Sequence, residues 1–178
     1  MQRVDEIGKE EHVRGPQDAA LTLIEYGDFQ CPYCARAHFA LAELVDELGD
    51  EAGGIRLVYR HLPLADLHPL AELAAEAAEA AASQGKFWEM HDALFEQQRQ
   101  VADPQDLAVL GESLDLDIDR FGAEVQERRH RARVQQDVTR GQRDGADRTP
   151  TFFINGVRYP GDSDRDSLEA ALRGALGR

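Results

Sequence analysis

The sequence has 178 residues, enough for one well-packed domain with room for an insertion, and its hydrophobic fraction of 42% is typical of a globular protein. Its formal net charge of −14 argues against binding to nucleic acid or anionic membranes, because each phosphate contact needs a cation. No stretch approaches the roughly 20 apolar residues of a membrane span. Residues 1–20 are polar and show no secretory signal, so we expect a cytoplasmic protein, although a trimmed exported chain would look the same.

The first third of the chain predicts a strand, a helix and a second strand after an irregular arm over residues 1–20. Residues 21–26 alternate as a strand does, and residues 33–48 have the apolar spacing of an amphipathic helix that ends at Gly49. Residues 55–59 form the second apolar strand. A strand–helix–strand unit of this length predicts that the two strands are parallel.

An all-helical block follows, and strands return only near the end of the chain. Ala, Glu and Leu dominate the start of the block, and Asp103-Pro104 is a typical helix start within it. The predicted elements are helices over 67–84, 86–98, 103–114 and 117–143, strands over 151–154 and 157–159 joined by Asn155-Gly156, and a last helix capped by Ser163.

Two cysteines, Cys31 and Cys34, lie three positions apart where the first strand gives way to its helix. A helix N-terminus offers unpaired amides and the positive end of the helix dipole, so the pKa of the Cys31 thiol should fall below the value of about 8.5 of free cysteine. We therefore predict that Cys31 is the attacking nucleophile and Cys34 the resolving thiol of a disulfide exchange. A structural bridge is disfavoured because it would close a loop of only four residues.

Glu25 lies six residues before Cys31, on the strand that leads to the dithiol. Two interpretations fit this position: a carboxyl buried beneath the dithiol that takes the proton of Cys34, or a solvent-facing strand residue. His38 is the histidine nearest in sequence to the cysteines, and we expect it on the helix surface, as we do Arg36. We predict no metal site, because two cysteines supply only half of the usual four ligands.

The stretch Phe29-Gln30-Cys31-Pro32-Tyr33-Cys34, together with Thr149-Pro150-Thr151-Phe152-Phe153-Ile154-Asn155-Gly156, resembles the thioredoxin superfamily. The helical block between these two stretches makes the chain similar to the DsbA-like thiol-disulfide oxidoreductases, a resemblance that extends to residues 59–64 and 87–91. The overall texture is especially similar to thioredoxin-like domains that accompany some sodium/proton antiporters, although this sequence contains no transporter.

This resemblance implies an α/β protein with a thioredoxin fold, in the order β-α-β then β-β-α, over residues 12–66 and 144–178. Residues 67–143 would be an inserted all-helical subdomain. The resemblance also implies that Pro150 is a cis-proline facing the dithiol, which leaves the Thr149 backbone free to pair with an extended substrate. The family carries an acidic residue at the position of Glu25, which favours the buried interpretation.

The activity implied is exchange of disulfides with protein or peptide substrates, with Pro32, Tyr33, Thr149 and Pro150 as the substrate-contact surface. No cofactor is implied beyond the redox-active Cys31–Cys34 disulfide, which an unidentified partner would recycle.

Two alternatives to this activity stay open. The Pro-Tyr pair between the cysteines is typical of glutaredoxins, so glutathione is a possible co-substrate, although the preceding Asp28, Phe29 and Gln30 include no basic residue to hold it. The helical block could instead form a peptide-binding or holdase module in which the dithiol is incidental.

Overall fold

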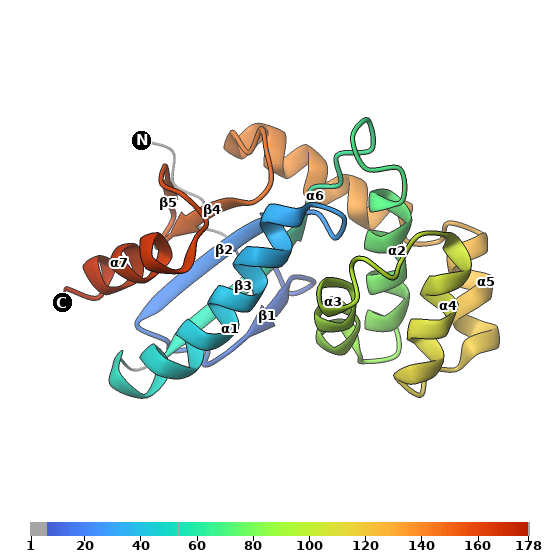
Figure 1. Ribbon diagram of the computed structural model, residues 1–178, viewed down its shortest axis with the longest axis horizontal. Helices are drawn as coiled ribbons and strands as arrows, with labels where there is room; N and C mark the ends of the chain where they lie inside the picture. The colour runs from blue at the N-terminus through green and yellow to red at the C-terminus, as the bar shows by residue number, and fades with distance from the viewer. Residues whose placement is uncertain (1–6, 53, 178) are drawn as a thin grey trace.

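A mixed sheet of five strands lies at the centre of the computed structural model, which describes residues 7–52 and 54–177 (Figure 1). In chain order the strands are β1 (His12–Arg14), β2 (Leu21–Gly27), β3 (Ile55–His61), β4 (Thr151–Ile154) and β5 (Val157–Tyr159). Their order across the sheet is β1-β3-β2-β4-β5. Strands β2 and β3 are parallel, as predicted, and the other neighbouring pairs are antiparallel.

The prediction of an irregular arm over residues 1–20 is wrong for β1. His12, Val13 and Arg14 pair with Tyr59, Val58 and Leu57 of β3, respectively, and form an edge of the sheet. A strand of three residues is too short for an alternating pattern to be visible in the sequence. Residues 1–6, which belong to the same predicted arm, lie outside the described residues.

Seven helices are present in the described part of the chain. Four of them, α2 to α5, lie together to one side of the sheet, and α6 runs from that group back toward the sheet (Figure 1). None is both long and apolar enough to cross a bilayer. The helices are α1 (Pro32–Ala52), α2 (Ala71–Ala82), α3 (Phe87–Glu96), α4 (Pro104–Ser113), α5 (Ile118–Gln126), α6 (Arg131–Asp144) and α7 (Arg165–Ala175).

Several predicted helix boundaries differ from the structure: α2, predicted over 67–84, spans only Ala71–Ala82, and α3, predicted over 86–98, ends at Glu96. The single helix predicted over 117–143 is divided into α5 and α6, because Arg128 adopts a left-handed backbone with φ 54°. Helix α1 does not end at Gly49 but continues to Ala52, and the left-handed glycine after it is Gly54. The N-cap of α7 is Asp164 rather than Ser163.

The two faces of the sheet are covered by different helices. Alternate residues of β2, such as Leu21 and Leu23, pack in one buried cluster with residues of α1 and α7. Ile24 and Tyr26 point to the other face and share a cluster with Val138 of α6. Because this alternation also places Glu25 on the face of Leu21 and Leu23, its side chain projects toward α1.

Helices α2 to α6 occupy most of the predicted insertion over 67–143, but their core is continuous with the sheet domain. Phe29, Cys34 and Tyr59 belong to the same buried cluster as the apolar side chains of the helical block. The division of the chain into two domains therefore stays a prediction, and the dithiol lies where the two parts share a core.

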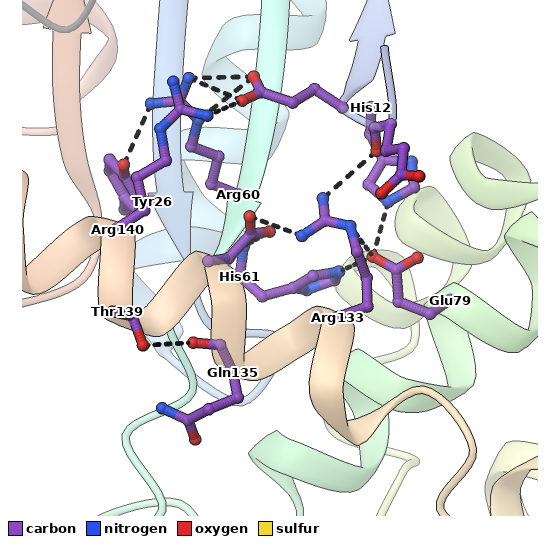
Figure 2. A network of polar contacts seen from close by, with 12 residues as sticks. His12, Tyr26, Arg60, His61, Glu79, Arg133, Gln135, Thr139 and Arg140 are labelled. Atoms are coloured by element: carbon purple, nitrogen blue, oxygen red, sulfur yellow. Dashed lines mark hydrogen bonds and ion pairs between the residues drawn. The ribbon is translucent and has the colours of Figure 1, made fainter. Parts of the chain in front are cut away.

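A buried polar network also joins the helical block to the sheet (Figure 2). The side chain of Arg60 in β3 is fully buried and donates to Glu11 at 3.0 Å and to the Tyr26 hydroxyl at 3.1 Å. Tyr26 in turn donates to Asp144 of α6 at 2.7 Å. Arg140 of α6 also pairs with Glu11, so one glutamate connects the segment before β1 with β3 and α6.

The second part of this network is centred on Glu79 of α2 (Figure 2). One of its carboxylate oxygens lies 2.7 Å from Nε2 of His12 and 2.9 Å from Nε2 of His61. Burial alone would raise the pKa of Glu79, but hydrogen bonds with the two histidines hold it well below its ordinary range. Arg133 lies 3.7 Å from the same oxygen and pairs with Asp137, which accepts from the backbone N–H of His61.

Candidate active site

The dithiol lies directly between the end of β2 and the start of α1. The backbone N–H of Cys31 donates to the carbonyl oxygen of Asp28, and the carbonyl oxygen of Cys31 accepts from the N–H of Ala35 in the first turn of α1. Cys31 keeps 4% of its surface exposed and Cys34 keeps none, and both are free thiols. The arrangement places an outer sulfur at the helix N-terminus and an inner sulfur one turn further along.

Hydrogen bonds and burial give the two cysteine thiols very different pKa values. The contact with the Cys34 thiol is the largest influence on Cys31, and with smaller contributions from the backbone N–H groups of Cys34 and Tyr33 it lowers the pKa of Cys31 to about 5, against the opposing effect of burial. Burial, followed by the hydrogen bond to Cys31 and the charge of Glu25, raises the pKa of Cys34 well above its ordinary value. Near neutral pH Cys31 is therefore a thiolate and Cys34 a thiol.

Glu25 is buried in the central strand beneath the dithiol, so the interpretation of a solvent-facing residue is wrong. It lies opposite Tyr59 of β3 and Phe152 of β4 in the sheet register. Burial, and then the charge of Cys31, raises the pKa of Glu25 to about 8. Its Oε1 atom has no hydrogen-bond partner among the described residues, so this oxygen is available for a proton.

The loop that precedes β4 closes the site from the other side. Because β4 runs antiparallel to β2, with Thr151 opposite Tyr26, its first residues lie at the end of β2 that leads to the dithiol. The Thr149–Pro150 peptide bond is cis. The Sγ atom of Cys31 lies 3.4 Å from the carbonyl oxygen of Thr149, to which it donates a hydrogen bond while protonated, so segments 118 residues apart in the sequence meet at this sulfur.

All seven residues that the sequence nominated for the site lie around this meeting point. Tyr33 is 57% exposed and lines a groove of about 270 Å³ with Thr149 and Pro150. Pro32 is also exposed and borders a second groove between α1 and the segment after α3. Both grooves are open to solvent beside Cys31, which is where an extended polypeptide would have to lie to reach its sulfur.

Asp28 is a site residue whose role the sequence analysis missed. It is almost fully buried, and its carboxylate accepts from the backbone N–H groups of Gln30 and Leu64 and from Nδ1 of His68, each at 2.8 Å. These bonds fix the loop before Cys31 to the segment after β3. The contact with Gln30, two positions on, is an Asx-turn, which is the signal in the sequence that could have identified it.

His38 and His91 lie beside Glu25, and the prediction of a surface position for His38 is wrong. His38 is buried and its ring stacks on Phe95, with 5.2 Å between ring centroids. With Glu25 both histidines line a pocket of about 190 Å³. Burial lowers the pKa of His91 to about 4, and its Nδ1 lies 2.8 Å from Asp92. The Nε2 atom of His91 has no partner among the described residues.

Two groups of side chains have potential metal-ligand atoms within 4.8 Å of one another in the described chain. In each group a histidine nitrogen is hydrogen-bonded to the carboxylate, and an arginine, Arg133 or Arg14, lies near the same carboxylate. The carboxylate charges are thus already balanced by protein groups. The two groups are His12, His61 and Glu79, and His38, His91 and Asp92.

Comparison with known proteins agrees with this architecture. The family model described as Thioredoxin matches residues 8–173. The Na(+)/H(+) antiporters NhaA 1 of Salinispora arenicola and NhaA 3 of Salinispora tropica are each 48% identical to this chain over 166 residues. The match covers 93% of this chain but 25% of theirs, so the chain spans about a quarter of the length of these curated relatives.

Three solved structures are similar over nearly their whole length. Oxidised BdbD from Bacillus subtilis has a TM-score of 0.84 at 22% identity and covers 99% of this chain and 97% of its own. A thioredoxin-like oxidoreductase from Silicibacter pomeroyi has a TM-score of 0.76 at 27% identity, over 96% and 95% of the two chains. DsbA2 from Pseudomonas aeruginosa has a TM-score of 0.71 at 25% identity, over 95% and 96%. The chain therefore belongs to the thioredoxin family and has the fold of its DsbA-like members.

Proposed function

We propose that this chain exchanges disulfides with protein or peptide substrates through Cys31 and Cys34. The observation that carries the proposal is the convergence of an ionised outer sulfur, a protonated inner sulfur and the Thr149 carbonyl oxygen above a buried carboxyl. A thiolate that has a second thiol within reach can attack a disulfide and then release its product.

In the first step the Cys31 thiolate attacks one sulfur of the substrate disulfide. The substrate S–S bond breaks, a bond from Cys31 to substrate sulfur forms, and the other substrate sulfur leaves as a thiolate. In the second step Cys34 gives its proton to Glu25 and attacks Cys31, which releases the second substrate thiolate. Two electrons have then passed from the dithiol to the substrate, and the reverse sequence oxidises a substrate dithiol.

The position of Glu25 suits the second step. The charge of the Cys31 thiolate is the second cause of the raised pKa of Glu25, after burial. In the mixed disulfide Cys31 carries no charge, so this cause disappears and the carboxyl ionises more readily. A larger fraction of Glu25 is thus in the ionised form that can accept a proton at the stage when Cys34 has to lose its own.

The substrate would contact Pro32 and Tyr33 on one side of Cys31, and Thr149 and Pro150 on the other. The low pKa of Cys31 stabilises the reduced form of the dithiol and so favours the oxidising direction of the exchange. No cofactor is proposed beyond the Cys31–Cys34 disulfide. A recycling partner, with glutathione as one candidate, and a cytoplasmic location are part of the same proposal.

The experiment is a comparison of Cys31→Ser and Cys34→Ser with the unaltered chain in insulin reduction and in oxidative refolding of a scrambled protein. We expect Cys31→Ser to reduce both activities to the uncatalysed rate. Cys34→Ser should accumulate a mixed disulfide between Cys31 and the substrate that mass spectrometry detects, because the second step is blocked. Full activity of Cys31→Ser in both assays would contradict the proposal.

A further inference from the structure

We propose that the preferred substrates are polypeptides with acidic residues on both sides of the reacting cysteine, which Arg36, Arg99 and Arg148 select. The inference rests on the proposed function, because these arginines surround the sulfur that would react. It adds a chemical class of substrate to a site that otherwise would accept any accessible disulfide.

Two grooves each include a residue that contacts Cys31. The first, of about 270 Å³, is bounded by the segment before β4 and includes Arg148 and Thr149, whose carbonyl oxygen contacts the Cys31 sulfur at 3.4 Å. The second, of about 610 Å³, lies between α1 and the segment after α3 and includes Gln98, whose side chain donates to the Cys31 carbonyl oxygen at 3.0 Å. An extended chain crossing Cys31 therefore enters both grooves.

The arginines of these grooves differ from most others in the protein. Arg36 and Arg99 in the second groove and Arg148 in the first are exposed, and none forms an ion pair with a carboxylate of the described chain. By contrast, most arginines elsewhere in the described chain pair with acidic side chains, as Arg128 does with Glu76 at 2.6 Å. Unpaired guanidinium groups are thus present beside the dithiol of a chain whose net charge is −14.

The acidic groups near the grooves do not cancel these cations. The second groove contains one acid, Glu96, beside its two arginines. The first contains Asp162 beside Arg148 and Arg158, and Arg158 is paired at 2.7 Å with Asp147 outside the groove. Each groove therefore keeps an arginine that can bind a carboxylate of the substrate, with the paired geometry that guanidinium groups favour.

Local contacts hold the three arginines near the sulfur. The Arg36 guanidinium lies over the Tyr33 ring, 4.7 Å from its centroid. Arg99 directly follows Gln98, whose side chain also donates to the carbonyl oxygen of Phe29 at 2.8 Å. Arg148 directly precedes the Thr149–Pro150 bond. The backbone positions of the three arginines are therefore set relative to Cys31, and their side chains line the two grooves.

The placement favours a polypeptide over a small thiol compound. The cations lie on both sides of Cys31, so carboxylates before and after the substrate cysteine are needed to meet them all. Tyr33 and Phe39, which are 57% and 50% exposed, add apolar surface to the two grooves. The acidic remainder of the protein repels such a substrate, so attraction is confined to the dithiol and orients the approach.

The test uses three sets of disulfide-linked peptide dimers that differ only in the residues flanking a central cysteine: aspartates, asparagines or lysines. The rate constant for oxidation of the reduced full chain by each dimer is measured by acid quenching and mass spectrometry. Each value is divided by the rate of the same dimer with a small uncharged thiol, which removes differences in intrinsic reactivity. Glutathione disulfide forms a separate arm.

We expect the aspartate dimer to react fastest and the lysine dimer slowest. An exposed ion pair changes a rate by about two- to fivefold, so the ratio of aspartate to asparagine rates should fall by that factor for each of Arg36→Gln, Arg99→Gln and Arg148→Gln. The ratio should also fall as salt rises from about 0.02 to about 0.5 M, because exposed charges are screened. Circular dichroism checks that each variant is folded.

Arg131→Gln is the matched control. Arg131 is exposed at the start of α6, has no carboxylate partner in the described chain and lies in neither groove, so its loss should leave the ratio unchanged. Equal normalised rates for the three dimers, or a fall with Arg131→Gln as large as with the groove variants, would overturn the inference while the exchange activity stands. An arginine effect confined to glutathione disulfide would overturn it in favour of a small thiol substrate. Absence of exchange with every dimer would instead refute the proposed function.

Discussion

Glu25 combines two properties that ordinarily conflict in a folded protein. It is buried in the central strand, and its Oε1 atom has no partner among the described residues, so burial raises its pKa to about 8. In the unfolded chain the same carboxyl ionises near pH 4.5. Between these values the unfolded state has lost a proton that the folded state keeps, so Glu25 lowers the stability of the protein as pH rises through this range. Residues that lower stability in this way are typically found in active sites, where a shifted pKa serves the reaction.

The substitution Glu25→Gln should therefore slow the disulfide exchange and at the same time stabilise the folded protein. We expect the second step of the exchange, release of the substrate from Cys31, to accelerate as pH rises toward about 8 in the unaltered chain, because the pKa of Glu25 falls below that value once Cys31 is uncharged. The variant should lose this rise and be slower by about tenfold or more at pH 8. Urea unfolding of the variant at pH 8 should show higher stability. Rapid-quench measurement of mixed-disulfide decay gives the rate.

Glu89→Gln, on the exposed side of α3, is the control and should retain the rise of the rate with pH. A rise that persists in Glu25→Gln would assign the proton to another group.

The sequence identified site residues that lie in one recognisable local pattern. It did not identify residues whose role depends on contacts with segments far away in the sequence. Cys31 and Cys34 are recognisable because one short segment contains both their spacing and the start of the adjacent helix. Burial of His38 depends on Phe95 of α3, and the role of Asp28 depends on His68, 40 positions away. No periodicity within one element predicts such contacts, since they arise only when α1, α3 and the segment after β3 are packed together.

The pairing of β2 and β3 places Gly27 directly against Tyr59. A Cβ atom added at Gly27 would lie 2.6 Å from a ring carbon of Tyr59 and 2.7 Å from its hydroxyl oxygen. Tyr59 is fully buried, and its ring stacks on Phe29 with 5.2 Å between centroids, so it has no free volume into which to move. The end of the strand that leads to the dithiol therefore has no room for a side chain at position 27.

Gly27→Ala should lower the free energy of unfolding by about 1–3 kcal/mol, because the added methyl group overpacks the core beneath the dithiol. Urea denaturation measures this change. Gly122→Ala, in α5, is the matched control: its added Cβ meets no atom within 4 Å, and alanine should stabilise the helix by up to about 1 kcal/mol. Equal effects of the two substitutions would show that the approach to Tyr59 does not constrain the sheet.

Elements were predicted well where their ends carry local signals. Helix α4 begins where Asp103-Pro104 indicates, and Asp103 forms a capping box with Asp106. The break between α5 and α6 was missed because Arg128 has no intrinsic preference for a left-handed backbone. Its guanidinium donates to Glu76 of α2 at 2.6 Å and 2.7 Å, so a contact between helices accompanies the local conformation.

Across the whole molecule, buried ion pairs hold the helical block and the sheet in one relative position (Figure 2). Arg60 is fully buried between Glu11 and Asp144, while Glu79 of α2 contacts histidines of β1 and β3. The dithiol depends on this arrangement, since the site uses residues of both parts. Buried ion pairs add little stability over apolar packing, but removing one partner leaves an uncompensated charge.

Arg60→Met keeps much of the side-chain volume and removes the charge, which leaves Arg140 as the remaining arginine that Glu11 and Asp144 share. We expect the free energy of unfolding in urea at pH 7 to fall by about 1–3 kcal/mol, because the buried carboxylates lose hydrogen bonds to Arg60 but keep this second cation. The control is Arg165→Met: this arginine bridges Glu43 and Glu47 at the surface, and its loss should have a much smaller effect on stability, because exposed ion pairs contribute little. Adding Glu11→Gln to Arg60→Met should recover part of the loss, because it removes a buried carboxylate that has lost one of its two arginines. If Arg60→Met costs no more than Arg165→Met, the network does not hold the two parts together. If the double variant recovers nothing, the loss comes from packing around Arg60 rather than from its charge.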